Sequence, residues 1–236
     1  MVSVQLFPTR GAGVVGADLR SPSYTAAMAV WREQVVPRLT DVLLGTDDVR
    51  GHRQEVIDGL RGVVVEIGFG SGLNVPLYPP EVEMVYAIEP SAVGRKLAAK
   101  RVEASPVPIR FVGLDGQDLP LGGESVDAAL STFTLCTIPD VTRALHELRR
   151  VLRPGGRLHF LEHGLCPEPA TARWQHRLNG LQQRLAAGCN LDRPIDRLVR
   201  EAGFQIQELR NAWFLGPPPS KPWGYLCEGA AIKPVK

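Results

Sequence analysis

Several residues whose chemistry suits a nucleoside ligand come directly after, or within, apolar runs of this chain. The first run, residues 63–67, contains Glu66 and leads into Gly68-Phe69-Gly70-Ser71-Gly72. Alternate glycines allow a tight turn in which backbone N–H groups approach a ligand closely. Glu89 ends the next apolar run, where a carboxylate can accept hydrogen bonds from both hydroxyls of a ribose. Asp115 follows a third run and could accept from an exocyclic amine, so the three segments together predict a nucleoside-binding pocket.

The spacing of the glycines distinguishes between nucleoside cofactors. A dinucleotide-binding turn has the pattern G-x-G-x-x-G, whereas here the third glycine comes one place earlier and Leu73 stands where that pattern needs glycine. The negative charge of Glu66 would repel a pyrophosphate and attract the ammonium or sulfonium group of S-adenosylmethionine. We therefore expect S-adenosylmethionine as the cofactor. A nicotinamide-dependent oxidoreductase and an S-adenosylmethionine-binding protein without turnover are the alternatives.

Strands and helices alternate in the predicted order of elements. Buried strands alternating with helices indicate an α/β fold with a doubly wound parallel sheet. Ligands of such a sheet bind at the carboxyl ends of the strands, where the candidate residues lie. The last two strands are joined without a helix, which predicts an antiparallel hairpin at the end of the chain. Strands are expected at residues 62–67, 84–88, 109–112, 125–131, 157–161, 204–209 and 223–232, and helices at about 91–103, 138–152, 170–187 and 194–203.

The beginning of the chain differs in character from the rest. Residues 1–20 are glycine-rich and without periodicity, and a helical spacing of apolar residues begins near Ser23 with Tyr24 and Met28. We expect residues 1–60 to form an arm and a helical lid, with Tyr24 as a candidate lid residue. Residues 61–236 would then form the S-adenosylmethionine-binding domain.

The composition limits which partners and which cellular compartment are expected. The 236 residues carry a formal net charge of +2 and are 44% hydrophobic, which is ordinary for a globular protein and gives no sign of a nucleic-acid partner. The four cysteines are far apart in sequence, so we predict reduced thiols and no metal site. The sequence shows no signal peptide, and no apolar run near its start reaches the ~20 residues of a membrane span. We therefore expect a cytoplasmic protein without stable membrane insertion, whose oligomeric state the sequence leaves open.

Longer stretches of the chain carry a family resemblance. Residues 66–72, with Glu89, 115–120 and 151–156, resemble class I S-adenosylmethionine-dependent methyltransferases of the methyltransferase type 11 group, which includes the ubiquinone/menaquinone methyltransferases. A closer likeness is to the methyltransferase-like alkyl-thiol methyltransferases, although their membrane-anchoring N-terminal segment has no counterpart here. It is carried by Thr134-Leu135-Cys136, by the segment from Arg150 to Glu162-His163, and by Gly188-Cys189-Asn190-Leu191. The resemblance covers about 60–236 and implies a seven-stranded, Rossmann-like sheet.

The resemblance also implies roles for the residues at the strand ends. The three glycines would line the methionine part of the cofactor, Glu89 would hold the ribose, Asp115 and its neighbours would flank the adenine, and Thr132 would lie close to the cofactor. The expected cofactor-binding set is Glu66, Gly68, Phe69, Gly70, Ser71, Gly72, Asn74, Glu89, Pro90, Asp115, Gly116, Gln117, Thr132 and Phe133.

The chemistry of methyl transfer asks little of a catalytic group. The sulfonium is already an excellent leaving group, so alignment of the two reactants is the main requirement, and a thiol or phenol needs at most a modest base. His163 is the best candidate base, Glu162 is the second, and a purely structural role for His163 is the alternative. The acceptor is expected to be a small thiol, phenol or quinol, or amine. Its pocket should lie between the N-terminal helices, the helix at 170–187, whose Trp174 is expected to pack with three leucines of the same face, and the loop at 216–222.

Overall fold

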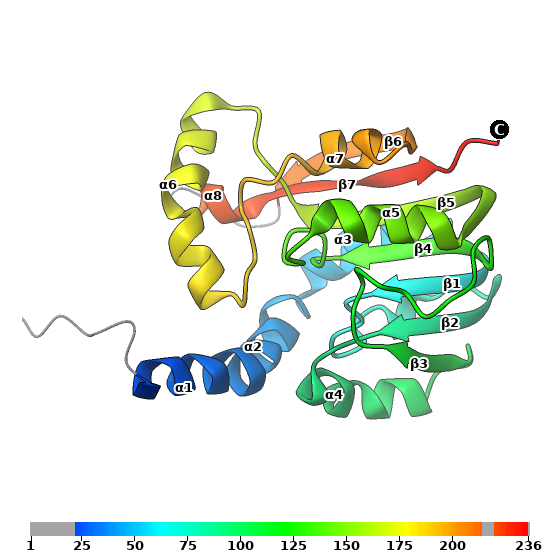
Figure 1. Cartoon of the computed structure of the whole chain (residues 1–236), viewed down its shortest axis with the longest axis horizontal. Coiled ribbons are helices and arrows are strands. Elements are labelled where there is room, and N and C mark those ends of the chain that lie inside the picture. The colour runs from blue at the N-terminus through cyan, green and yellow to red at the C-terminus, as the bar shows by residue number, and fades with distance from the viewer. Residues whose placement is uncertain (1–21, 214–219, 236) are drawn as a thin grey trace, which may run out of the picture.

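The computed structural model describes residues 22–213 and 220–235, and its strands form one mixed sheet (Figure 1). The strands are β1 (Gly62–Ile67), β2 (Val82–Ile88), β3 (Ile109–Gly113), β4 (Val126–Thr132), β5 (Leu152–His163), β6 (Gln205–Trp213) and β7 (Tyr225–Ile232). Their order in the sheet is β3-β2-β1-β4-β5-β7-β6. β1–β5 are parallel, and β7 is antiparallel to β5 and β6. The predicted doubly wound seven-stranded sheet with a C-terminal antiparallel hairpin is confirmed.

Helices precede, connect and follow these strands. Ser91 caps α4 by accepting a hydrogen bond from the Gly94 N–H. Only a short 3-10 helix follows the glycine segment, because Pro76 and the two prolines at 79–80 limit its length. The helices are α1 (Pro22–Val30), a π-helical turn (Trp31–Val35), α2 (Val36–Leu43), α3 (Asp47–Ile57), the 3-10 helix (Val75–Leu77), α4 (Ala92–Glu103), α5 (Val141–Val151), α6 (Pro169–Leu185), α7 (Ile195–Glu201) and α8 (Lys221–Gly224).

Successive side chains of the central strands point to opposite faces of the sheet, and each face is covered by helices. Val65 and Ile67 of β1 pack into one core with α5 and α7. Val64 packs into the other core with α3 and α4. Glu66 therefore points toward the α3 face. The carboxyl ends of β1, β2 and β4 meet at one edge of the sheet, the edge toward which α1, α2 and α6 lie in Figure 1.

The helix α3 is an element that the sequence analysis does not identify. It lies within residues 1–60, where only an arm and a helical lid are expected. Val49, Val56 and Ile57 are seven and eight residues apart and share one helix face, which is buried against the sheet. Part of the 1–60 segment thus belongs to the core, whereas the lid role of α1 and α2 stays a prediction. Tyr24, the candidate lid residue, has its side chain outside the described residues.

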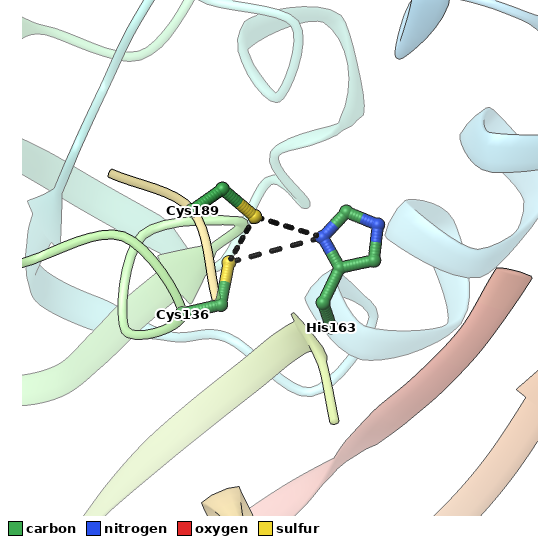
Figure 2. Close-up of side chains that lie close together, drawn as sticks. All are labelled: Cys136, His163 and Cys189. Carbon is green, nitrogen blue, oxygen red and sulfur yellow. Dashed lines mark hydrogen bonds between the residues drawn. The ribbon is translucent and has the colours of Figure 1, made fainter. Parts of the chain in front are cut away.

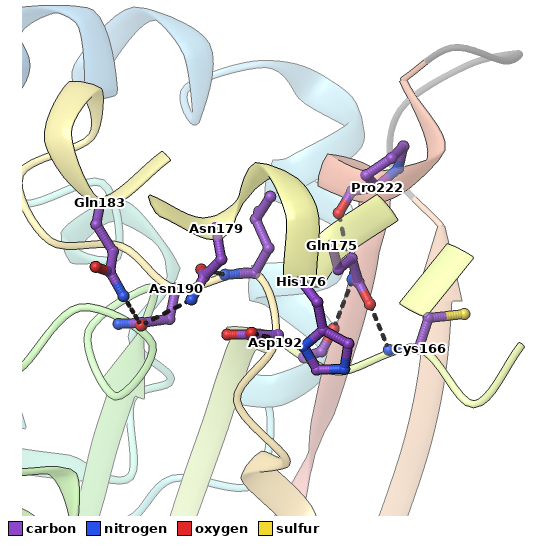
Figure 3. A network of polar contacts seen from close by, with 10 residues as sticks. Cys166, Gln175, His176, Asn179, Gln183, Asn190, Asp192 and Pro222 are labelled. Atoms are coloured by element: carbon purple, nitrogen blue, oxygen red, sulfur yellow. Dashed lines mark hydrogen bonds and ion pairs between the residues drawn. The ribbon is translucent and has the colours of Figure 1, made fainter. Parts of the chain in front are cut away.

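The prediction that Trp174 and the leucines of α6 pack together in the interior is wrong. Three of its apolar side chains are each about half exposed, namely Trp174, Leu181 and Leu185. Polar side chains hold the helix in place instead (Figure 3). Buried Gln175 accepts a hydrogen bond from the Cys166 N–H and donates to two backbone carbonyls, while Asn179 and Gln183 donate to the side-chain oxygen of Asn190. α6 is therefore oriented by hydrogen bonds and leaves apolar surface open.

One further difference concerns the start of a helix. The helix expected at about 138–152 begins only at Val141, as α5, and Asp140 caps it by accepting from the Arg143 N–H. Across residues 22–213 and 220–235, none of the helices has both the length and the apolarity needed to cross a membrane.

Candidate cofactor and substrate site

The glycine turn lies at the carboxyl end of β1. Gly68, Gly70 and Gly72 have φ angles of 66°, 58° and 75°, a region that residues with a Cβ rarely adopt. At Gly68 the space is also lacking, because a Cβ would lie 1.9 Å from the Thr134 hydroxyl oxygen. Only glycine therefore allows the backbone at this turn to pass close to its neighbours and to a ligand.

Glu89 lies beside this turn and is only 5% exposed. Its carboxylate accepts hydrogen bonds from the Gly70 N–H at 2.5 Å and the Ser91 N–H at 2.7 Å. Burial raises the pKa of Glu89, and the two backbone donors oppose that rise. The carboxylate is thus fixed at the edge of the pocket next to the turn, at a position suited to accept from hydroxyl groups of a ligand.

A buried polar network lies next to the glycine turn on the α3 face. Glu66 accepts hydrogen bonds from the Asn74 amide at 2.8 Å and from the Tyr78 hydroxyl. Burial raises the pKa of Glu66 to about 7, although these two donors and the Arg53 cation oppose the rise. A cation bound near Glu66 would favour its ionised form.

Arg53 completes this network and is not among the residues predicted from the sequence. α3 presents its guanidinium, which donates to Asn74 Oδ1 at 2.8 Å and Thr132 Oγ1 at 2.9 Å and lies over the ring of Phe133. Burial lowers the pKa of Arg53 to about 10, so the group stays charged at neutral pH. Its Nε has no hydrogen-bond partner among the described residues. The available signal was its position four residues after Val49, on the apolar face of α3.

A pocket of about 920 Å³ opens at this edge of the sheet. Across it from the strand ends lie α6 and the segment that follows, including Gly188 and Asn190, together with Arg32 from the N-terminal helices. The indole of Trp31 donates a hydrogen bond to the Leu185 carbonyl at 2.8 Å, so the N-terminal helices and α6 meet at the pocket. Seven of the predicted cofactor residues line it, namely Gly68, Glu89, Pro90, Asp115, Gly116, Gln117 and Phe133.

The remaining predicted cofactor residues lie beside or beneath the turn. Phe69 packs in the core, with its ring 5.2 Å from that of Phe111. The Ser71 carbonyl accepts a hydrogen bond from Arg101. Gly70 contacts Glu89, and Asn74 and Thr132 belong to the Arg53 network, so these residues shape the site from behind the pocket wall.

The segment after β3 forms the far end of the pocket. Asp115 is exposed and accepts hydrogen bonds from the backbone and side chain of Gln117, which lower its pKa. Gln117 in turn accepts from the Asp140 N–H. Gln117 is thereby fixed between two loops, and Asp115 faces the solvent at the pocket rim.

A second hollow, of about 960 Å³, lies at the opposite edge of the sheet. Its lining includes Gly62, Asp127 and Arg153, near the amino ends of the strands. None of the predicted site residues lies there, and ligands of parallel α/β sheets bind at the carboxyl ends of strands. The pocket next to Glu89 is therefore the candidate site, although the second hollow is slightly larger.

Glu162, one of the two candidate bases, is completely buried at the end of β5. Its carboxylate accepts hydrogen bonds from the Ser131 hydroxyl at 2.6 Å and from the backbone N–H groups of residues 134–136 at 3.0–3.1 Å. These contacts fix the turn after β4. The geometry favours a positioning role for Glu162 and does not favour its action as a base.

His163, the other candidate base, lies beside two thiols (Figure 2) and close to an aromatic ring. Its Nδ1 is 3.4 Å from Cys189 Sγ and 3.9 Å from Cys136 Sγ, and its ring is 5.2 Å from that of Phe133. Phe133 has a φ of 55°, an unusual backbone conformation that clusters at functional sites. Burial lowers the pKa of His163, but Cys189, Glu162 and a backbone hydrogen bond with Trp223 together outweigh burial, so the pKa is raised overall. The base role of His163 stays a prediction.

Comparison with known proteins identifies related chains. The family described as "Methyltransferase domain" matches residues 65–160. Thiol S-methyltransferase TMT1B of Rattus norvegicus is 31% identical over 79% of this chain and 74% of its own length. The human TMT1B is 33% identical over 75% of each chain.

Solved structures support the same fold. A putative methyltransferase of Bacillus halodurans superposes with a TM-score of 0.62 at 17% identity, over 79% of this chain and 99% of that one. A possible histamine N-methyltransferase of Thermotoga maritima gives a TM-score of 0.60 at 22% identity, over 87% and 99%. With a pocket at the strand ends and relatives of this kind, the chain belongs to the family of S-adenosylmethionine-dependent methyltransferases that includes the thiol S-methyltransferases.

Proposed function

We propose that this methyltransferase transfers the methyl group of S-adenosylmethionine to the sulfur of a small thiol. The observation that carries the proposal is the single pocket at which the glycine turn, Glu89 and Asp115 converge, and which continues to the wall formed by α6. The names of the relatives that match most of the chain support a thiol acceptor. Phenols, quinols and amines are the competing acceptor classes.

The charges of the site suit each part of the cofactor. Glu89 would accept hydrogen bonds from the ribose hydroxyls, and Gln117 and the backbone near Gly116 would flank the adenine. Arg53, a buried cation beside the glycine turn, would pair with the carboxylate of the methionine part. Glu66 would face its positive charges. This division places one acidic and one basic group at the amino-acid end of the cofactor, as a zwitterion requires.

The reaction that follows is a direct displacement. The acceptor sulfur attacks the methyl carbon, the bond from that carbon to the sulfonium breaks, and its electron pair remains on the S-adenosylhomocysteine product. The protein mainly aligns the two reactants, and the thiol must lose its proton before or during attack. His163, whose Nδ1 lies beside two thiols behind the pocket wall, would supply that function.

The test is a panel of acceptors. The purified protein is incubated with S-adenosylmethionine and with thiols, phenols, quinols or amines of matched size, and S-adenosylhomocysteine and the methylated product are quantified together. We expect equimolar S-adenosylhomocysteine and methyl thioether with thiols. Turnover confined to phenols, quinols or amines would overturn the proposed acceptor, and binding of NADH in place of S-adenosylhomocysteine would overturn the cofactor.

A further inference from the structure

Three potential metal ligands from distant parts of the chain converge behind the pocket wall. Cys136 lies in the turn after β4, His163 at the end of β5, and Cys189 in the segment after α6. The two sulfurs are 3.7 Å apart, and His163 Nδ1 lies 3.9 Å from Cys136 Sγ and 3.4 Å from Cys189 Sγ. Figure 2 shows all three donor atoms pointing toward one common centre.

These separations match the edges of a tetrahedral zinc coordination sphere. Zinc bonds of ~2.3 Å to sulfur and ~2.05 Å to nitrogen place two sulfur ligands about 3.8 Å apart and sulfur and nitrogen ligands about 3.6 Å apart. The observed distances scatter closely around both values. A disulfide needs its sulfurs at ~2.05 Å, so Cys136 and Cys189 have the spacing of two ligands and not that of a bonded pair.

The surroundings hold the three donors in place. The Cys136 N–H donates to Glu162 Oε2 at 3.0 Å, and the Asn190 amide donates to the Cys136 carbonyl at 2.9 Å. His163 has a backbone hydrogen bond with Trp223, and its second ring nitrogen points away from the sulfurs in Figure 2. Histidines that bind metals commonly use their second nitrogen on a backbone carbonyl, which fixes the tautomer and the ring orientation.

We propose that Cys136, His163 and Cys189 bind one zinc-class ion with an open fourth position, and that the acceptor thiol occupies this position. Two thiolates and one imidazole form a known set for zinc sites that leave one position to substrate. Thr137, which follows Cys136, and Gly188, which precedes Cys189, both line the pocket. The three donors thus lie directly behind the pocket wall, and the open position would face the methyl donor through it.

The second half of this proposal rests on the proposed function and defines the thiol chemistry. On coordination the acceptor loses its proton to solvent and binds as a thiolate. Its sulfur then forms the new bond to the methyl carbon as the sulfonium bond breaks. The ion thus takes over the task assigned to a base, and His163 acts as a ligand.

Metal binding is tested without the methyl donor, and a small thiol is added only after the ion is bound. The full chain is freed of metal with a chelator, kept reduced with a phosphine, and titrated with zinc against a chromophoric competitor. We expect one equivalent to bind with a Kd of about 1 µM or tighter. Cobalt in place of zinc should give thiolate charge-transfer absorption, and adding a small thiol should shift the visible spectrum.

Matched variants distinguish this site from other thiols. Cys189→Ser and His163→Asn should weaken metal binding by at least about 100-fold. Substituting residues that only hydrogen-bond to metal ligands already weakens binding 10–100-fold. Cys166→Ser and Cys227→Ser, which alter equally buried thiols, should leave it unchanged. Two results would overturn the site. One is a fully reduced protein that binds no metal, including one whose Cys136–Cys189 disulfide had to be reduced first. The other is metal binding by Cys189→Ser as tight as that of the wild type.

The two halves of the proposal fail separately. A cobalt spectrum that thiols do not shift would overturn the coordination of the acceptor. Tight metal binding without methylation of any thiol would support the site and count against the proposed function alone.

Discussion

Removing the Glu89 carboxylate should weaken cofactor binding by a predictable amount. The carboxylate is 5% exposed and is held by the Gly70 and Ser91 N–H groups, so it does not need to be ordered when a ribose arrives. A hydrogen bond to a charged group contributes about 1.5–3 kcal/mol. Glu89→Ala should therefore raise the Kd for S-adenosylhomocysteine roughly 10- to 150-fold. Glu89→Gln should lie between this variant and the wild type, because one acceptor oxygen remains.

Isothermal titration calorimetry with two ligands makes this test specific. 5′-Methylthioadenosine has the ribose but not the amino-acid part of the cofactor, so Glu89→Ala should weaken both ligands by the same factor. Glu83→Ala provides a control, since Glu83 lies exposed on the same strand. Unchanged affinity in a Glu89→Ala protein that still unfolds cooperatively would refute the assignment of Glu89 to the ribose.

The other residues of the site give three further predictions. Arg53→Met should weaken the binding of S-adenosylhomocysteine about 10- to 100-fold, because charged hydrogen bonds are lost, and should leave the binding of 5′-methylthioadenosine unaffected. Equal weakening of both ligands would contradict the assignment of Arg53 to the cofactor carboxylate. Gly68→Ala, whose Cβ would meet Thr134 at a positive φ, should lower the free energy of unfolding in urea by at least about 2 kcal/mol, whereas Gly122→Ala, where a Cβ has open space, should be near neutral. The pKa of Glu66 is raised from 4.5 to about 7, so the folded state binds this proton more tightly than the unfolded state. The protonated Glu66 therefore contributes its full stabilisation below pH 4.5, and this contribution is lost as the pH rises toward 7. The free energy of unfolding of the wild type relative to Glu66→Gln should fall by up to about 3 kcal/mol over this range, and parallel pH profiles would contradict the shift.

The sheet and one side of the pocket could be predicted from the sequence because their signals are local. β-branched runs mark the buried strands, and the acidic and glycine residues that follow them in the chain lie at the carboxyl ends by the geometry of parallel strands. Gly68, Glu89 and Asp115 therefore needed no tertiary information to be placed at one pocket.

Arg53 and the cysteine cluster could not be predicted because their signals are not local. α3 combines a short apolar face with many charged residues, and only its contact with the sheet shows that Arg53 points inward. Cys136, His163 and Cys189 are separated by 27 and 26 residues, far from any metal-binding spacing. The exposed apolar side chains of α6 were misplaced for a related reason, since helical periodicity does not distinguish a face that packs against the core from a face that stays exposed.

The most direct test of the central claim follows the methyl group itself. The protein is incubated with S-adenosylmethionine carrying a deuterated methyl group and with a small alkyl thiol, and the products are identified by mass spectrometry. The account predicts a methyl thioether that carries all three deuterium atoms on the carbon bonded to sulfur, formed in equal amount to S-adenosylhomocysteine. Label found on oxygen, nitrogen or carbon acceptors with none on sulfur would contradict it.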